Sequence, residues 1–314
     1  MAPRHVGLLA ALAAVWGGSY LLIKYALEDF EPAVIVWIRC VLAGIVLYAV
    51  MRLRGGGVEA RAANAELRAR PWRAILLGAL AIALPFNLIT FGELEVPSGM
   101  TAVLIAPASL FVAAFAPFID VSEKVRRSAL GGMFLGLAGV ALLVGVESVH
   151  SLGEFLGSLA IFGAAACYAL SSFVVKRYKG LTSVTTSFIS ILVASVLTLP
   201  AAIATAPSEM PSLRPLLSVV VLGVVGTALA FVIFYKLITE TGAGRASLVS
   251  YLAPGIALFY GALLLDEPIT AVSIGGLALI LGGVALASRK PKEDGGSVEL
   301  PATVHAKAAA ADAH

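Results

Sequence analysis

Charged side chains are scarce in this sequence. They make up 13% of its 314 residues, against 60% hydrophobic residues, and the mean hydropathy is +0.97. A soluble domain carries roughly 25% charged residues. The apolar residues come in long uninterrupted runs, which a soluble core does not need. The shortage of charge therefore excludes a soluble globular domain and indicates a polytopic α-helical membrane protein.

Signatures of enzymes, nucleotide sites and metal sites are also missing. The chain has no G-x-x-x-x-G-K-[ST] loop, so it does not itself hydrolyse ATP, and it has no nucleophile elbow or H-E-x-x-H spacing. The four histidines, at positions 5, 150, 305 and 314, lie outside the apolar runs. The two cysteines, Cys40 and Cys167, lie inside them as small packing residues. We therefore predict no enzyme activity, no cofactor, no metal, no nucleic acid and no ATPase subunit.

Ten apolar segments are long enough to cross a membrane. A hydrocarbon core of about 30 Å needs about 20 apolar residues per helix. The segments are 6–26, 32–51, 73–92, 98–119, 128–147, 153–175, 183–204, 215–236, 244–265 and 271–288. The first is too long for a signal peptide and lacks a cleavage site followed by soluble sequence, so we expect it to be retained. The sequence thus predicts an all-α membrane protein with ten transmembrane helices.

Basic residues are sorted between the two sides of this arrangement. Of the 22 Lys and Arg residues, Arg214 lies in an outer loop, and Lys24 and Arg39 lie within spans. All the others lie in inner segments when the N-terminus is taken as cytoplasmic. Because positive charge stays on the cytoplasmic side, we predict that both termini are cytoplasmic.

The chain contains an internal repeat. Residues 76–99 align with residues 221–244, which pairs Gly78 with Gly223. Each half holds five helices, an odd number, so the second half is predicted to lie upside down relative to the first. Inverted repeats are a construction plan of secondary transporters, whose binding site lies near the midplane at the repeat interface.

The repeat divides the chain into three parts. We place the first five-helix repeat at 6–147 and the second, inverted repeat at 153–288. The polar, aperiodic segment 289–314 is expected to be a disordered cytoplasmic tail.

Two stretches of the chain resemble EamA-type proteins of the drug/metabolite transporter superfamily. The first is "WGGSYLLIKYALEDFEPAVIVWIRCVLAG", with a tryptophan-glycine-serine turn, a lysine, an acidic-proline loop and an arginine. The second is "TGAGRASLVSYLAPGIALFYGALLLDEPITAVSIGGLALILGGVAL", with a proline, a glutamate loop and paired glycines. The resemblance covers about residues 6–288. It implies a ten-helix carrier that alternates between inward-open and outward-open states.

The resemblance also implies a function and a location. Most characterised members of this superfamily export small metabolites such as amino acids, so we expect a secondary carrier in the cell inner membrane of a bacterium. Its partners would be a small-molecule solute and membrane lipid, and a monomer is compatible with this function. A passive channel is the nearer alternative, and a membrane assembly factor without transport activity is a more distant one.

The sequence departs from the family pattern in one place. The first half has Ser109 where the second half has Pro254, while Pro107 lies two residues earlier. We therefore expect the fourth helix to bend at a different place from the ninth.

Arg39 is the most informative candidate residue. It lies about 10 Å below the outer boundary at 1.5 Å per residue, where an arginine costs roughly 2.5–3.5 kcal/mol on insertion scales. It is expected either to pair with Glu93 or Glu95 or to face a wet cavity and bind an anion, and these two interpretations are compatible. Snorkelling is a third. An intramembrane cation without a carboxylate in the middle of any span favours an anionic or zwitterionic, amino-acid-like solute.

The remaining candidates are polar or aromatic residues within the spans. Trp16 and Ser19 lie one turn apart in the first helix, and Tyr168 and Ser171 are their repeat-related counterparts. They suit a cavity that binds a small amphipathic solute, although the aromatic residues could equally pack between helices. Lys24 is expected to form a surface pair with Glu28, four residues on.

Three further features complete the set. Asn87 follows Pro85 by two residues and either repairs the backbone there or binds the solute. Tyr251 on the ninth helix is a weaker binding candidate. The basic segment 52–71 is expected to be a loop along the inner leaflet, where anionic lipid attracts it.

Overall fold

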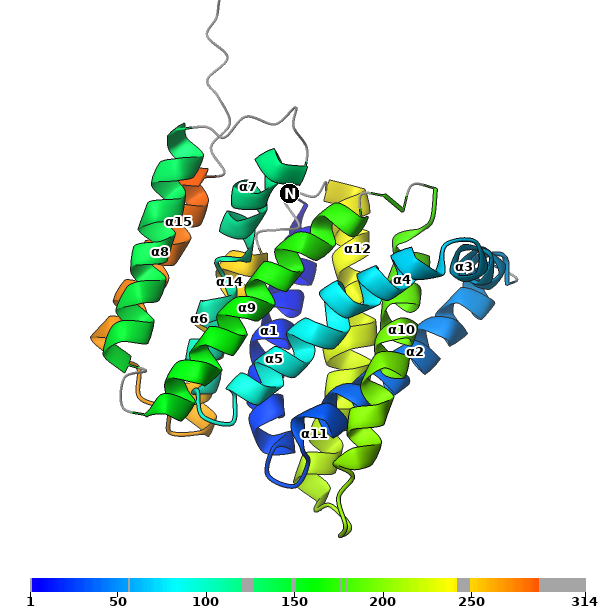
Figure 1. Ribbon diagram of the computed structural model, residues 1–314, viewed down its shortest axis with the longest axis horizontal. Helices are drawn as coiled ribbons and strands as arrows, with labels where there is room; N and C mark the ends of the chain where they lie inside the picture. Colours follow the sequence, from blue (N-terminus) through cyan, green and yellow to red (C-terminus); the bar gives the residue numbers. More distant parts are fainter. Residues whose placement is uncertain are drawn as a thin grey trace, which may run out of the picture.

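The computed structural model describes residues 2–55, 57–119, 127–147, 151–175, 177–178, 180–241 and 249–287, and this described part contains helices and connections but no strand (Figure 1). The predicted tail, 289–314, lies outside it. The helices are α1 Pro3–Ala26, α2 Pro32–Gly55, α3 Val58–Ala69, α4 Pro71–Gly78, η1 Ala79–Ala83, α5 Leu84–Gly92, α6 Ser98–Ile105, α7 Ala108–Ile119, α8 Arg127–Glu147, α9 Leu152–Val175, α10 Ser183–Ala204, α11 Leu213–Gly223, η2 Val224–Leu229, α12 Ala230–Thr241, α14 Val249–Leu264 and α15 Ala271–Ala287.

Six helical rods are long and apolar enough to cross a membrane. They are Pro3–Ala26, Pro32–Leu53, Pro71–Gly92, Leu152–Val175, Ser183–Ala204 and Leu213–Phe234. Shorter apolar helices occupy the other four predicted segments, at Ser98–Val112, Leu130–Leu143, Leu252–Leu264 and Ala271–Leu286. The all-helical membrane fold is therefore confirmed, whereas the count of ten crossings stays a prediction.

A π-helical turn interrupts two of these rods at the same point of the repeat. The third rod carries η1 at Ala79–Ala83, and the eighth predicted span carries η2 at Val224–Leu229. Both turns fall within the segments that align in the sequence, 76–99 and 221–244. Short π-helical segments inside α-helices are rare and occur frequently at functional sites. The two halves thus share a local distortion as well as a residue pattern.

A glycine precedes each π-helical turn where another helix approaches closely. A Cβ atom on Gly78 would lie 2.6 Å from Cγ1 of Val193 in α10, and one on Gly223 would lie 2.8 Å from Cβ of Leu42 in α2. Any side chain at these positions would push the helices apart. Each half therefore packs its third rod against the second helix of the other half.

The other helix pairs follow the same exchange between halves. Helix α1 packs against α14 while its counterpart α9 packs against α6, and α8 packs against α15 at one edge of the bundle (Figure 1). In the α8–α15 pair, a Cβ atom on Gly139 would lie 2.8 Å from the Gly276 oxygen, and one on Gly283 would lie 2.5 Å from the Gly132 oxygen. The glycines of the fifth and tenth segments thus serve close packing, as the sequence suggests.

The segment expected to be a loop at 52–71 is largely helical, so that prediction is wrong. Helix α3 spans Val58–Ala69 and buries Ala60 and Ala63, and it packs against α2, α4 and α10. Alanine has the highest intrinsic helix propensity, and the buried alanines three residues apart give this basic segment one apolar face. The many basic residues of segment 52–71 favoured the interpretation as a loop over an amphipathic helix.

The predicted difference between the fourth and ninth helices is confirmed. Helix α6 ends at Ile105 and α7 begins at Ala108, so the break falls at Ala106 and Pro107. Helix α14 instead continues through Pro254. Pro107 lacks the N–H group that continues the helical hydrogen bonds, which accounts for the break in the fourth segment, whereas Pro254 is accommodated inside α14.

Polar contacts join the two halves at one end of the bundle. Helix α1 begins and α15 ends at the same end (Figure 1). At the opposite end, Arg214 donates hydrogen bonds to Glu28 from Nε at 3.0 Å and from Nη2 at 2.5 Å. Beside it, the backbone N–H and the hydroxyl of Ser212 each donate to Asp29 at 2.6 Å. These bonds join the α1–α2 connection of the first half to the start of α11 in the second.

Candidate substrate-binding site

Arg39 lies in the interior, between the two halves. Its side chain comes from α2, and the residue is 7% exposed. The guanidinium Nε donates to the Thr227 hydroxyl of η2 at 2.6 Å, and its central carbon lies 4.0 Å above the ring of Phe86 in α5. The π-helical turn fixes this acceptor, because the Thr227 hydroxyl donates in turn to the Leu222 carbonyl at 2.9 Å. Residues of both halves therefore hold the guanidinium.

The expected pairing of Arg39 with an acidic residue is not found. Among the described residues Arg39 forms no salt bridge, and its nearest hydrogen-bond acceptor is a neutral hydroxyl. Glu95 instead lines a cavity at the other end of the α5–α6 connection. Glu93 is fully buried, and neither of its carboxylate oxygens accepts a hydrogen bond from any described residue.

Lys24 also has a different partner from the expected one. Its ammonium donates to the backbone carbonyl of Glu93, while Glu28, its expected partner, binds Arg214. The surface-pair interpretation is therefore wrong. The pairing fails because a lysine near a helix end reaches inward as easily as along the helix surface, and the end of α5 presents a free carbonyl.

Two tyrosines complete this group. Tyr20 of α1 and Tyr168 of α9 pack against the same core cluster, which contains Ile35 of α2 and Ile89 of α5, each one helical turn before Arg39 and Glu93. We call the whole set the polar cluster. It consists of Tyr20, Lys24, Arg39, Glu93, Tyr168 and Thr227. Its members come from α1, α2, the end of α5, α9 and η2, so the cluster lies where the two repeats meet.

The first-helix candidates are engaged in packing and backbone contacts. The Trp16 ring lies 6.4 Å from that of Phe231 and 5.2 Å from that of Phe234, both in α12. The buried Ser19 hydroxyl donates to the Val15 carbonyl at 2.9 Å. Trp16 therefore forms part of an aromatic contact with the second half, and the structure does not bring it to Arg39.

Of the two repeat-related counterparts of Trp16 and Ser19, one belongs to the polar cluster and the other contacts its own helix. Tyr168 joins the polar cluster, whereas the Ser171 hydroxyl donates to the Tyr168 carbonyl at 2.8 Å. The Asn87 amide donates to the Ala83 carbonyl at 2.7 Å, at the last residue of η1. This contact corresponds to the backbone-repair interpretation of Asn87. The side chain of Tyr251 lies outside the part of the structure that is described.

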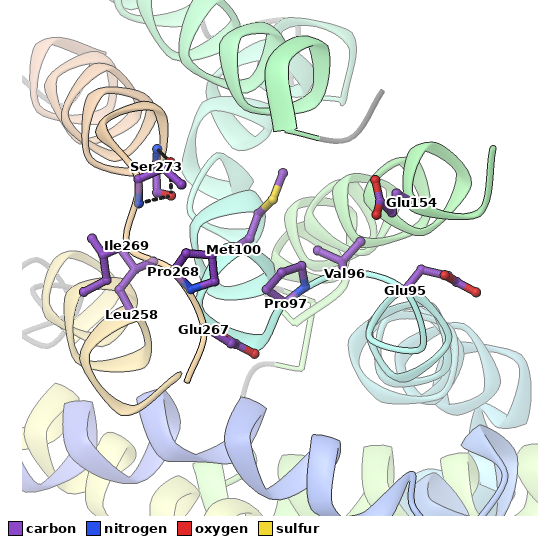
Figure 2. Close-up of a pocket in the computed structure, with 11 residues that line it drawn as sticks. Glu95, Val96, Pro97, Met100, Glu154, Leu258, Glu267, Pro268, Ile269 and Ser273 are labelled. Atoms are coloured by element: carbon purple, nitrogen blue, oxygen red, sulfur yellow. Dashed lines mark hydrogen bonds between the residues drawn. The ribbon is translucent and has the colours of Figure 1, made fainter. Parts of the chain in front are cut away.

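A separate cavity of about 270 Å³ lies between the α5–α6 and α14–α15 connections (Figure 2). Apolar residues such as Met100 and Leu258 line much of it, together with three glutamates, 95, 154 and 267. Glu267 accepts hydrogen bonds from Ser98 N at 2.7 Å, Ser98 Oγ at 3.0 Å and Gly99 N at 3.0 Å. It thereby caps α6. The cavity and the polar cluster share the α5–α6 connection, which supplies Glu95 to the cavity and Glu93 to the cluster.

Sequence reasoning did not name Thr227 or Tyr20, and it named Glu93 only as a possible partner of Arg39. Thr227, like Asn87, is a polar residue within an apolar span, and this feature could have identified it as a candidate. Tyr20 adjoins the glycine turn that drew attention to its neighbours. Glu93 follows the last apolar residue of its span and therefore resembles an ordinary loop glutamate. Only the tertiary structure, in which α2 and α9 pack against α5, shows that this carboxylate is buried.

A helical membrane protein with buried opposite charges at the interface of two repeats has the construction of a solute transporter. The model of the EamA-like transporter family matches this chain twice, over residues 5–145 and 155–289. The protein therefore belongs to the EamA-like transporter family. It is a multi-pass membrane transporter of the cell inner membrane, and its family gives no indication of enzymatic activity.

Curated relatives match over most of their length. The chain is 28% identical over 284 residues to "Uncharacterized inner membrane transporter YedA" of Escherichia coli (strain K12), covering 89% of each protein. It is 28% identical over 291 residues to "S-adenosylmethionine/S-adenosylhomocysteine transporter" of Chlamydia trachomatis serovar L2, covering 88% of this chain and 85% of that protein. A crystal structure with 20% sequence identity aligns over 91% of this chain and 97% of its own, with a TM-score of 0.65. That likeness supports the fold.

Proposed function

We propose that this protein is a secondary carrier that moves a small amino-acid-like solute, zwitterionic or anionic, across the inner membrane by alternating access. The single observation that carries the proposal is the polar cluster. Arg39 and Glu93 are buried and Lys24 is half-buried between the repeats, and no two of these three residues form a salt bridge. Buried charges without partners are costly, and in a transporter a solute of complementary charge lowers that cost.

Arg39 is the proposed ligand of the solute carboxylate. A guanidinium offers a planar fork of donors that matches a carboxylate with two parallel hydrogen bonds. Its contacts with Thr227 and Phe86 occupy Nε and one face of the group, which leaves its terminal nitrogens for a solute. The name of the chlamydial relative is consistent with this solute class, because S-adenosylmethionine and S-adenosylhomocysteine both carry an α-carboxylate and an α-amino group.

The proposed carrier has ten crossings, arranged as two inverted repeats over 6–147 and 153–288, with both termini in the cytoplasm. Basic residues at the inner ends support this orientation, and the shared position of η1 and η2 supports the repeat. Alkaline phosphatase fused at position 290 should be inactive, whereas the same fusion within 207–213 should be active. The reverse pattern would contradict the orientation and the inversion together.

Solute exchange in proteoliposomes tests the proposed activity. Purified full-length protein is reconstituted, vesicles are loaded with unlabelled solute, and uptake of labelled S-adenosylmethionine, S-adenosylhomocysteine and each standard L-amino acid is measured. A carrier gives uptake that is accelerated by the same unlabelled solute inside the vesicle. Uptake without this acceleration would favour a passive channel, and uptake of none of these compounds would contradict the amino-acid-like class. Export is the direction that the family resemblance implies, and inside-out vesicles test it.

A further inference from the structure

The Glu93 carboxylate is buried without hydrogen-bonding partners. The residue is 0% exposed, and its two side-chain oxygens accept no hydrogen bond from the residues that the structure describes. Most buried polar atoms in proteins have at least one partner. A carboxylate that departs from this rule in a transporter interior is therefore a candidate for a group that binds something during the transport cycle.

The cations near Glu93 are directed to other acceptors. Lys24 of α1 donates to the backbone carbonyl of Glu93 itself, which holds its charge near the carboxylate without a salt bridge. Arg39 of α2 donates to Thr227. Tyr20 of α1 and Glu267 of the α14–α15 connection are the other titratable groups that interact with Glu93. Glu267 carries the same sign of charge and therefore disfavours an ionised Glu93.

The protonated form of Glu93 suits this environment better than the ionised form. Transferring a carboxylate out of water costs several kcal/mol even after relaxation of the protein, and hydrogen bonds usually offset much of that cost. Here the described residues supply none. Lys24 and Arg39 lie nearby and lower the cost of ionisation, so a further positive charge at this place is enough to favour the ionised form. Such a carboxyl group releases its proton when a positively charged ligand group arrives and binds it again when that group leaves.

We propose that Glu93 is a proton-binding site whose proton is exchanged for the positively charged amino group of the solute. In the empty site Glu93 carries the proton. When a zwitterionic solute binds, its carboxylate contacts Arg39, its ammonium group takes the place of the proton at Glu93, and that proton passes to water on the open side. Solute and proton then cross the membrane in opposite directions. This inference rests on the proposed function, because it assigns the second end of the same solute.

The first experiment measures proton binding without any solute. Infrared difference spectra of the purified full-length protein are recorded across a pH titration, and the carbonyl band of protonated carboxyl groups is followed. Wild-type protein should retain one buried carboxylic acid at neutral pH, Glu93→Gln should lose that band, and Glu95→Gln should retain it. Glu95 is a matched control because it lies two residues away and is exposed. A wild-type spectrum without a protonated carboxyl group at neutral pH would overturn the inference.

The second experiment measures coupling in proteoliposomes. The probe is S-adenosylmethionine, or an L-amino acid that gives exchange in the panel above. In wild-type vesicles a pH gradient should drive accumulation of this probe. Glu93→Gln should retain exchange, with its half-saturating concentration raised about tenfold by the loss of one charge-assisted contact, and should lose accumulation driven by the gradient. Accumulation by Glu93→Gln at the wild-type level would overturn the inference.

The two experiments separate the inference from the proposed function. If no probe is exchanged, the proposed solute class fails, while the infrared titration still decides whether Glu93 binds a proton. If Glu93→Gln does not fold, a wild-type protein without a protonated carboxyl group at neutral pH, or without any response to a pH gradient, still overturns the inference. Exchange by the wild-type protein with no response to a pH gradient would support the carrier and contradict proton coupling.

Discussion

Replacement of Arg39 by leucine separates the functional role of this residue from its structural role. In the folded protein Arg39 has one charge-assisted hydrogen bond, to Thr227, and one cation–π contact, to Phe86. Such contacts contribute about 1.5–3 and 0.5–2 kcal/mol, respectively. Against them stands a cost of roughly 2.5–3.5 kcal/mol for an arginine deep in the membrane. The two sides nearly cancel, so Arg39→Leu should insert, fold and melt close to the wild-type temperature.

Transport should respond very differently to the same change. Removing one partner of a buried hydrogen-bonded charge pair costs about 2–5 kcal/mol in binding, and each 1.4 kcal/mol is a factor of ten. Arg39→Leu should therefore lower exchange of a carboxylate-bearing solute by at least about 30-fold. Arg39→Lys retains the charge but loses the planar fork, so we expect a smaller loss, of about tenfold.

The assay pairs thermal unfolding in detergent with initial exchange rates in proteoliposomes at matched protein content. Thr227→Val is the control for positioning, because it removes the acceptor that orients Arg39 and leaves the charge in place. Exchange at the wild-type rate by Arg39→Leu would refute the binding role of this residue. A large fall in melting temperature with no independent loss of exchange would instead assign Arg39 to structure.

Three further predictions concern stability. Glu267→Gln weakens the cap of α6 and should lower the free energy of unfolding by about 1–3 kcal/mol, measured by denaturant titration; an unchanged value would contradict the capping role. Hydrogen bonds from Ser212 lower the pKa of Asp29, so this contact is complete at neutral pH and is lost as the pH falls through that lowered pKa. Asp29→Asn should accordingly lower the melting temperature at neutral pH, and the difference should vanish in acid; a difference that is independent of pH would exclude the ionised contact. Gly283→Ala should destabilise the α8–α15 pair by about 1–3 kcal/mol through overpacking, whereas Gly282→Ala, whose Cβ atom would lie 3.5 Å from its nearest neighbour, should be nearly neutral, and equal effects would argue against close packing.

The sequence contained most of the membrane architecture because a bilayer imposes strong one-dimensional constraints. A helix in hydrocarbon must satisfy its backbone internally, so each spanning helix appears as a long apolar run. Apolar helices lie in all ten of the predicted segments. The repeat was visible for the same reason, since glycines that permit close approach recur at equivalent positions, as Gly78 and Gly223 do.

Local distortions of these helices were harder to predict from the sequence. The break before α7 followed from the position of Pro107, because proline acts through the chain itself. The turns η1 and η2 each follow a glycine, Gly78 and Gly223, but a glycine in an apolar span does not by itself predict a π-helical turn. The segment of helix α3 was predicted to be a loop because it is rich in basic residues, although it is also rich in alanine.

The sequence by itself determined that Arg39 is a cation placed at a depth where it must meet water or an anion. Only the tertiary structure decided which groups it meets, and they are Thr227 and Phe86, not an acidic partner. It also decided that Lys24 turns inward and that the buried Glu93 carboxylate has no hydrogen-bond partner among the residues that the structure describes. The physical reason is that hydropathy reports the preference of a segment for lipid or water. The environment of one side chain depends instead on which other helices close around it, and those helices are distant in the sequence.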